Sequence, residues 1–155
     1  MNVTADELAD AVLTASRALV GVAAKSLAAA PADVTLPQYR VLVVVATRGP
    51  QRPTDLAAEL GVAASSITRL CDRLVRKKLV KRQLRASNRR EYKIQITDQG
   101  QAIVDAVMVS RRLEIRRLLG RIPPGRRQQL LVTLRELSLA AGEPESPASP
   151  LGWPV

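Results

Sequence analysis

The segment from residue 53 to 96 changes its hydrophobic period once, and that change restricts the folds open to the chain. Between residues 63 and 78, apolar residues recur at i, i+3, i+4, i+7 and i+8, the spacing of one helix face. These residues are Ile67, Leu70, Cys71, Leu74 and Val75. After Leu79 the apolar residues alternate, which predicts strands at 80–84 and 92–96 around a long polar loop. The pattern therefore predicts a helix followed by a β-hairpin.

A shorter helix is predicted just before this one, from Pro53 to Leu60, because proline suits the first turn of a helix. Gly61 follows directly, and glycine readily adopts the left-handed conformation that turns the chain sharply. Two short helices joined by a glycine-containing turn match the helix-turn-helix pattern. In that pattern the first helix packs across the second, and the second lies in the major groove of DNA.

Further helices are predicted at residues 4–29, 36–47, 98–119 and 125–140. The segment 36–47 is apolar almost all round and rich in β-branched residues, so a buried strand is the alternative there. Thr97 is placed to cap the helix that follows it. The sequence thus predicts a mainly α (α+β) fold.

The predicted domains follow from this order of elements. We expect residues 36–97 to form a winged helix-turn-helix domain, residues 1–35 and 98–141 a helical dimerisation region, and residues 142–155 a flexible tail. The terminal helices carry apolar stripes that are too rich to remain in water. Pairing them in a two-fold dimer would bury both stripes and set two recognition helices about one DNA turn apart. The alternative is a monomer whose own helices cover the stripes.

Composition excludes several classes of protein. Aromatic residues make up 2% of the chain and Phe is absent, so the core must be aliphatic, which suits packed helices. The single cysteine excludes an intrachain disulfide and suggests a cytoplasmic protein. The first residues are acidic where a signal peptide would be basic, and no apolar stretch is expected to span a membrane. Without His, a metal-ligand cluster, a glycine-rich phosphate loop or a nucleophile beside a base, no enzyme, metal site or cofactor is expected.

Positive charge is concentrated in one part of the chain. The formal net charge is +10, and residues 65–93 hold eleven basic and two acidic residues. Such a concentration fits a polyanion such as double-stranded DNA, although a basic face that meets only solvent is the alternative. Four more arginines lie between residues 111 and 117, and we expect them to form a solvated face rather than a phosphate or ligand site.

The polar face of the second helix carries residues that suit a DNA groove. Near its start, hydroxyls and an arginine could read base edges, because arginine forms two hydrogen bonds with guanine. These residues are Ser65, Ser66, Thr68 and Arg69. Residues expected to meet phosphates, which position a protein without reading sequence, are Arg73, Arg76, Lys77, Lys78 and, on the first helix, Thr54. Ordinary helix capping and surface polarity are the alternative for the hydroxyls.

The tip of the hairpin is polar and basic over residues 85–90. Its candidate DNA contacts are Arg85, Asn88, Arg89 and Arg90. They could reach the adjacent minor groove, whose negative potential attracts arginine. A basic turn that contacts only solvent is the alternative.

Three segments of this unit resemble the MarR family of bacterial transcriptional regulators. They are Leu56 to Val62, Ser65 to Val75 with its Asp72-Arg73-Leu74 run, and Ile94 to Gly100, where the chain leaves the hairpin, which is the wing of this fold. The resemblance covers about residues 5–140. It implies an obligate homodimer on a near-palindromic operator, with repression relieved by a small ligand or by oxidation. It also implies an effector site near Arg17, Leu36, Tyr39 and Arg40.

Cys71 does not fit the oxidation route. Relatives that sense peroxide generally carry the reactive thiol in the N-terminal helix, which has no cysteine here. Cys71 lies instead on the apolar stripe of the second helix, where a cysteine behaves as a small hydrophobic residue. We therefore expect a structural role for it and not redox sensing.

The wing departs from the family pattern, which usually carries acids as Asp-x-x-Asp-Arg-Arg. Arg85 and Asn88 stand at the acidic positions, and Asn88 accepts a hydrogen bond without bringing charge. We expect the wing to be less selective for DNA sequence and the dependence of DNA binding on salt to be steeper. An Arg85→Asp variant whose binding shows the same salt slope as the wild type would argue against this.

Two other functions remain as alternatives. An architectural protein would bind DNA without sequence preference, whereas a regulator keeps a large affinity ratio for one site. A winged helix that binds only proteins would not need the basic segment at residues 65–93.

Overall fold

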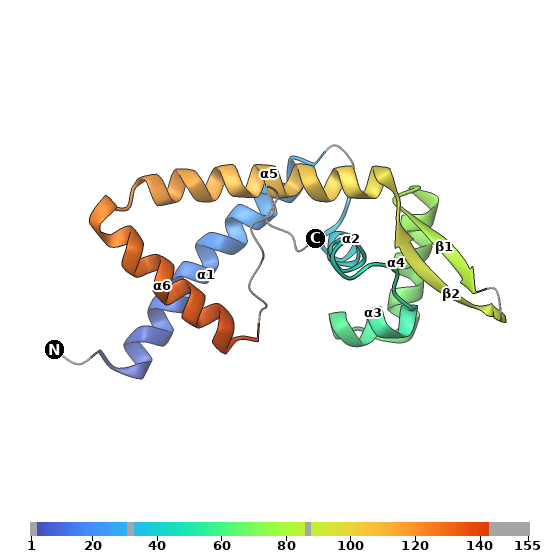
Figure 1. Cartoon of the computed structure of the whole chain (residues 1–155), viewed down its shortest axis with the longest axis horizontal. Coiled ribbons are helices and arrows are strands. Elements are labelled where there is room, and N and C mark those ends of the chain that lie inside the picture. The colour runs from blue at the N-terminus through green and yellow to red at the C-terminus, as the bar shows by residue number, and fades with distance from the viewer. Residues whose placement is uncertain (1–2, 31–32, 86–87, 143–155) are drawn as a thin grey trace. The chain divides into compact units, whose positions relative to one another are not determined.

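The computed structural model describes residues 3–30, 33–85 and 88–142, and side chains of residues 85–91 lie outside the description (Figure 1). Most of the predicted flexible tail also lies outside the described residues. In chain order the elements are α1 (Ala5–Ala28), α2 (Leu36–Arg48), α3 (Pro53–Leu60), α4 (Ala64–Arg76), β1 (Val80–Arg85), β2 (Asn88–Ile96), α5 (Asp98–Gly120) and α6 (Pro124–Ala140). The mainly helical fold with one small sheet confirms the predicted class. Two compact units form, one from residues 1–29 with 109–145 and one built on residues 30–108.

The core of the second unit is aliphatic, and α2 is central to it. Val41, Leu42 and Val45 of α2 are buried, and α2 contacts α3, α4 and β2. Buried partners on the other elements include Leu56, Ile67, Leu74, Ile94 and Val104. A helix with neighbours on several sides needs apolar residues almost all round, which explains its strand-like composition. The helix prediction for this segment is therefore confirmed, and the strand alternative is wrong.

The hairpin extends further than its hydrophobic pattern indicates. β1 and β2 pair antiparallel from Val80↔Ile96 to Leu84↔Tyr92, then shift register before Arg85↔Asn88. The prediction of a long loop over residues 85–90 is thus wrong, because β2 begins at Asn88. Backbone pairing in a projecting hairpin needs no buried face, so no apolar alternation marks it. The hairpin stands beside α4 in Figure 1.

A tight turn of three residues, Lys77–Leu79, ends α4. The amides of Lys78 and Leu79 donate to the carbonyls of Val75 (2.9 Å) and Leu74 (3.0 Å), which is the Schellman arrangement. Lys78 has φ 60°, in the left-handed region that favours glycine. The turn is therefore well bonded but carries local backbone strain.

Replacing Lys78 by glycine should raise the free energy of unfolding by about 0.5–1 kcal/mol, because left-handed backbone costs an L residue about 1–2 kcal/mol and glycine loses part of that gain through unfolded-state entropy. Urea denaturation followed by circular dichroism measures the change. Lys78→Ala removes the same charge but keeps the strain, so it is the matched control. Equal stability of the two variants would contradict this explanation.

The first unit leaves much apolar surface open. Lys25 of α1 lies 3.3 Å from Glu114 of α5, and Arg117 lies 2.5 Å from the same carboxylate. Ser26 is the one buried residue of α1 among those described, and α6 has none. Large apolar residues at least a third exposed in this unit include Leu8, Val12, Leu13, Leu19, Val20, Leu113, Leu118, Leu119, Leu131, Val132, Leu134, Leu137 and Leu139. The described helices of one chain therefore do not cover the predicted stripes.

α1 also corrects one expectation from the sequence. Its 24 residues are long and apolar enough to cross a membrane by length and composition alone, although no such segment was expected. Two basic residues, Arg17 and Lys25, are too few to break the apolar run. This is weak evidence for a span, because a helix that packs against other protein passes the same test.

Candidate nucleic-acid interface

The turn between α3 and α4 takes the form that the sequence predicts. Gly61 has φ 64°, in the left-handed region, and Val62 N–H donates to the carbonyl of Ala57 at 3.0 Å. Leu56 and Ala57 of α3 and Ile67 of α4 are buried. The first helix thus packs on the apolar face of the second and leaves the opposite face of α4 to solvent.

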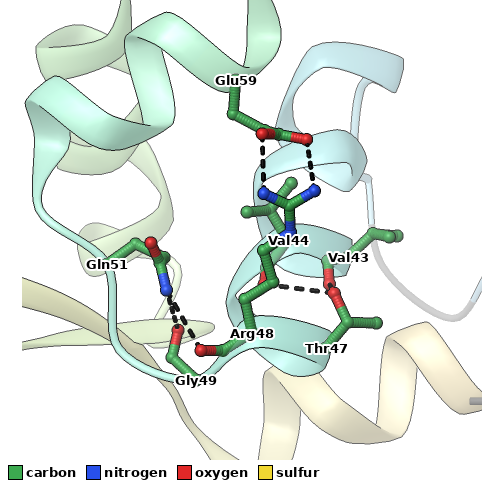
Figure 2. Close-up of polar contacts among 7 residues, drawn as sticks. All are labelled: Val43, Val44, Thr47, Arg48, Gly49, Gln51 and Glu59. Carbon is green, nitrogen blue, oxygen red and sulfur yellow. Dashed lines mark hydrogen bonds and ion pairs between the residues drawn. The ribbon is translucent and has the colours of Figure 1, made fainter. Parts of the chain in front are cut away.

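A bidentate ion pair joins α3 to the end of α2. Nη1 and Nη2 of Arg48 each donate to one carboxylate oxygen of Glu59 at 2.7 Å. Figure 2 shows the two contacts side by side. The side chains are 58% and 37% exposed, so the pair contributes at most about 1 kcal/mol to stability. Its two parallel hydrogen bonds nevertheless favour one orientation of α3 relative to the end of α2.

The loop between α2 and α3 is held by an additional backbone pairing that the sequence pattern does not show. Gln51 exchanges two backbone hydrogen bonds with Ile94 of β2, at 3.0 and 2.7 Å. Its side-chain amide donates to the carbonyls of Arg48 and Gly49 (Figure 2). A single paired residue has no period, which is why the sequence gives no signal for it. The loop, α2 and the wing are thereby tied into one frame around α4.

The solvent face of α4 carries the predicted contact residues. All six on the helix itself are exposed: Ser65, Ser66, Thr68, Arg69, Arg73 and Arg76. The helix begins after Ala63 with no side-chain cap, so capping does not account for the two serines. The Thr68 hydroxyl donates to the carbonyl of Ala64 at 2.9 Å, and its oxygen still offers acceptor capacity.

Lys77 lies just beyond α4 and is differently engaged. Its ammonium donates to the carbonyl of Asp33 and, at 3.2 Å, to Oε1 of Gln38. The predicted phosphate contact of Lys77 therefore competes with two contacts inside the protein.

A cluster of three residues fixes the hairpin beside α4. Arg82 of β1 lies 2.5 Å from the carboxylate of Asp72 on α4. The same guanidinium lies 5.0 Å from the centre of the Tyr92 ring on β2, a cation–π distance. Asp72, the acid of the Asp-Arg-Leu run, thus connects α4 to the wing. The predicted wing-tip side chains, Arg85, Asn88, Arg89 and Arg90, lie outside the described residues.

The remaining predicted site residues are spread over both units. Thr54 is exposed on α3, the helix that crosses α4. Arg17 belongs to the first unit and donates to the Thr14 hydroxyl at 3.1 Å. In the second unit Leu36 and Arg40 are exposed, whereas Tyr39 is 3% exposed. Tyr39 therefore contributes to the core of that unit, and the effector site remains a prediction.

Cys71 is buried on the inner face of α4. Burial, with a smaller effect of the nearby Asp72 carboxylate, raises the pKa of its thiol to about 11. The thiol is thus protonated throughout the physiological range. Among the described residues no group of three His, Cys, Asp and Glu side chains could hold a metal ion.

We expect native protein at pH 8 to react with the thiol reagent DTNB far more slowly than urea-unfolded protein, and peroxide to leave DNA binding intact. The raised pKa adds stability that is complete below the unfolded value near pH 9 and is lost as pH rises towards 11. Rates of DTNB reaction at matched pH test this. Loss of binding in peroxide that a Cys71→Ser variant resists would show a redox role instead.

Comparisons with known proteins agree with this geometry. The model of the MarR family matches residues 34–92. The chain is 30% identical over 108 residues to the helix-turn-helix transcriptional regulator YfiV of Bacillus subtilis, covering 70% of this chain and 68% of the relative. The crystal structure of RV1404 from Mycobacterium tuberculosis is 37% identical with a TM-score of 0.83, covering 95% of this chain and all of the other. A variant of S. aureus MepR bound to an oligodeoxyribonucleotide shares the fold at 20% identity, with a TM-score of 0.65 and coverage of 90% and 99%.

Proposed function

The chain belongs to the MarR family of transcriptional regulators, and on that premise we propose that it is a homodimeric repressor of sequence-specific type. Members of this family are regulators and not enzymes. In our proposal the winged helix-turn-helix domain, residues 36–97, binds double-stranded DNA at a near-palindromic operator. Residues 1–35 and 98–141 form the dimerisation region.

The observation that carries the proposal is the two-sided character of α4. Ile67, Cys71 and Leu74 anchor one face in the core, while hydroxyls and arginines on the other face lie open to solvent. A helix held in this way is rigid enough to read base edges, which requires defined side-chain positions. The oligodeoxyribonucleotide bound to the MepR variant supports DNA as the ligand of the shared fold.

The residues of α4 divide by their place along the helix. Arg69, in the second turn, would form the bidentate contact with guanine, and Ser65 and Ser66 would contact bases or phosphates beside it. Arg73 and Arg76 would meet phosphates, as would Thr54 on α3. The arginines of the wing tip would enter the adjacent minor groove.

A second copy of the chain is the occupant we propose for the open apolar surface of the first unit. Leucines and valines on α1, α5 and α6 remain exposed in the single chain. Acidic residues near the start of α1 (Asp6, Glu7 and Asp10) also complement the arginines of α5 and α6 in charge. A protein of this kind would act in the cytoplasm, and the binding of a small molecule would release it from DNA.

Genomic footprinting of the purified full chain tests the proposal. We expect protection of a few inverted-repeat sites whose half-sites are about 10 base pairs apart, because a two-fold dimer places its recognition helices one DNA turn apart. Uniform protection along the genome would favour an architectural protein. Absence of protection at physiological salt would remove DNA as the partner.

A further inference from the structure

We propose that Lys77 is a positioning residue for the recognition helix and not a phosphate contact. The inference rests on the proposed DNA-binding function. Lys77 caps the C-terminal end of α4, and its own amide closes the last turn by donating to the Arg73 carbonyl at 3.0 Å. Its side chain leaves the helix towards the segment before α2, where it meets two oxygen acceptors.

One acceptor lies in the first turn of α2 and the other just before that helix. Gln38 is 2% exposed, and its Oε1 also accepts from the amide of Thr35 at 3.2 Å in the capping box of α2. The other acceptor, the carbonyl of Asp33, lies between α1 and α2, just after the chain enters the second unit. A charged donor shared by two oxygens is a strong kind of hydrogen bond, and here it links elements 39 and 44 residues apart in sequence.

The two residues after Lys77 accept hydrogen bonds from the start of α5. Thr97, which caps α5, donates from its hydroxyl to the carbonyl of Lys78 at 2.7 Å and from its amide to that of Leu79 at 3.1 Å. The end of α4 is thus bonded both to the segment that enters the second unit and to the start of the helix that leaves it. A displacement of the segment before α2 would therefore reach α4 through Lys77.

Arg76 is the natural control, because it is adjacent, basic and exposed and makes no side-chain hydrogen bond or ion pair with the other described residues. We propose that Arg76 meets a phosphate and that Lys77 does not. The two residues then differ in a quantity that separates positioning from charge, the slope of log affinity against log salt concentration. Each lost phosphate contact makes that negative slope shallower by about 0.9, or by about 1.8 for a dimer.

The experiment compares Lys77→Met, Lys77→Arg and Arg76→Met in the full chain, on the best site found by footprinting, over a series of salt concentrations. For Lys77→Met we expect about tenfold weaker binding with an unchanged salt slope, and recovery of most of the affinity in Lys77→Arg. Arg76→Met should make the slope shallower. A fall in slope for Lys77→Met equal to that of Arg76→Met, or an unchanged affinity, would overturn the proposal.

A second measurement tests the contact between Lys77 and Gln38 without DNA. Lys77→Met, Gln38→Leu and the double variant form a cycle in urea denaturation, and a direct contact predicts that the two stability losses are not additive. Additive losses would overturn the positioning role even if the chain binds DNA. Conversely, coupling in this cycle together with no operator binding by the wild type would contradict the proposed function alone.

Discussion

Replacing Gly100 by alanine should lower the free energy of unfolding by about 3 kcal/mol, at the upper end of the usual cost of overpacking a close contact. Gly100 lies in the first turn of α5, and a Cβ there would overlap the carbonyl of Leu79 and approach Cγ1 of Ile96 to 2.9 Å. The carbonyl cannot retreat cheaply, because it accepts the hydrogen bond from Thr97 that anchors the turn after α4. The substitution therefore forces apart α5 and the end of the recognition helix.

Gly125→Ala is the matched control for this prediction. Gly125 also lies in the first turn of a helix, α6, and a Cβ there would meet no atom within 4 Å. That variant should be as stable as the wild type or slightly more stable. Urea midpoints at equal protomer concentration measure both changes. Gly100→Ala unfolding at the same urea concentration as Gly125→Ala would show that the close approach is not rigid.

Placing carboxylates at Leu134 and Leu137 of α6 should convert the protein to a monomer and abolish tight operator binding. The two leucines are 46% and 47% exposed in the single chain, so a partner would bury about half of each. At about 2 kcal/mol for a full leucine side chain, four such halves contribute about 4 kcal/mol per dimer, or roughly a thousandfold in association. Burying a charge would add to that loss.

Sedimentation equilibrium of the Leu134→Glu, Leu137→Glu variant measures the dimer directly. Operator affinity should fall at least a hundredfold, because a monomer reads only one half-site. Gln128→Glu with Gln129→Glu adds the same charge to the same helix away from these leucines, and it should remain dimeric. A leucine variant that is folded by circular dichroism, dimeric and fully active would place the dimer interface elsewhere.

Features set by neighbours in sequence could be predicted, and features set by long-range pairing could not. The face of α4, the left-handed Gly61 and the Thr97 cap each depend on residues within a few positions, and all three are present, with Gly100 N–H donating to the Thr97 hydroxyl at 3.2 Å. The pairing of Gln51 with Ile94 joins positions 43 apart and has no local signal.

Charge alone also does not distinguish neighbouring basic residues by their contacts within the protein. Lys77 and Arg76 are both basic residues near the end of the same helix, and the sequence treats them alike. Only the fold shows that the carbonyl of Asp33 and the side-chain amide of Gln38 come within reach of the Lys77 ammonium. The structure likewise explains the Thr97-x-x-Gly100 motif that follows the wing. Gly100 has no Cβ and so leaves room for the carbonyl of Leu79.

The affinity of the full chain for its best footprinted site, divided by its affinity for random duplex DNA at about 150 mM salt, tests the central claim most directly. Sequence reading by α4 predicts a ratio of about 10³ or more. Arg69→Ala should reduce the ratio, because it removes base contact rather than phosphate contact. A ratio near one for the wild type would contradict sequence-specific regulation and leave only non-specific binding.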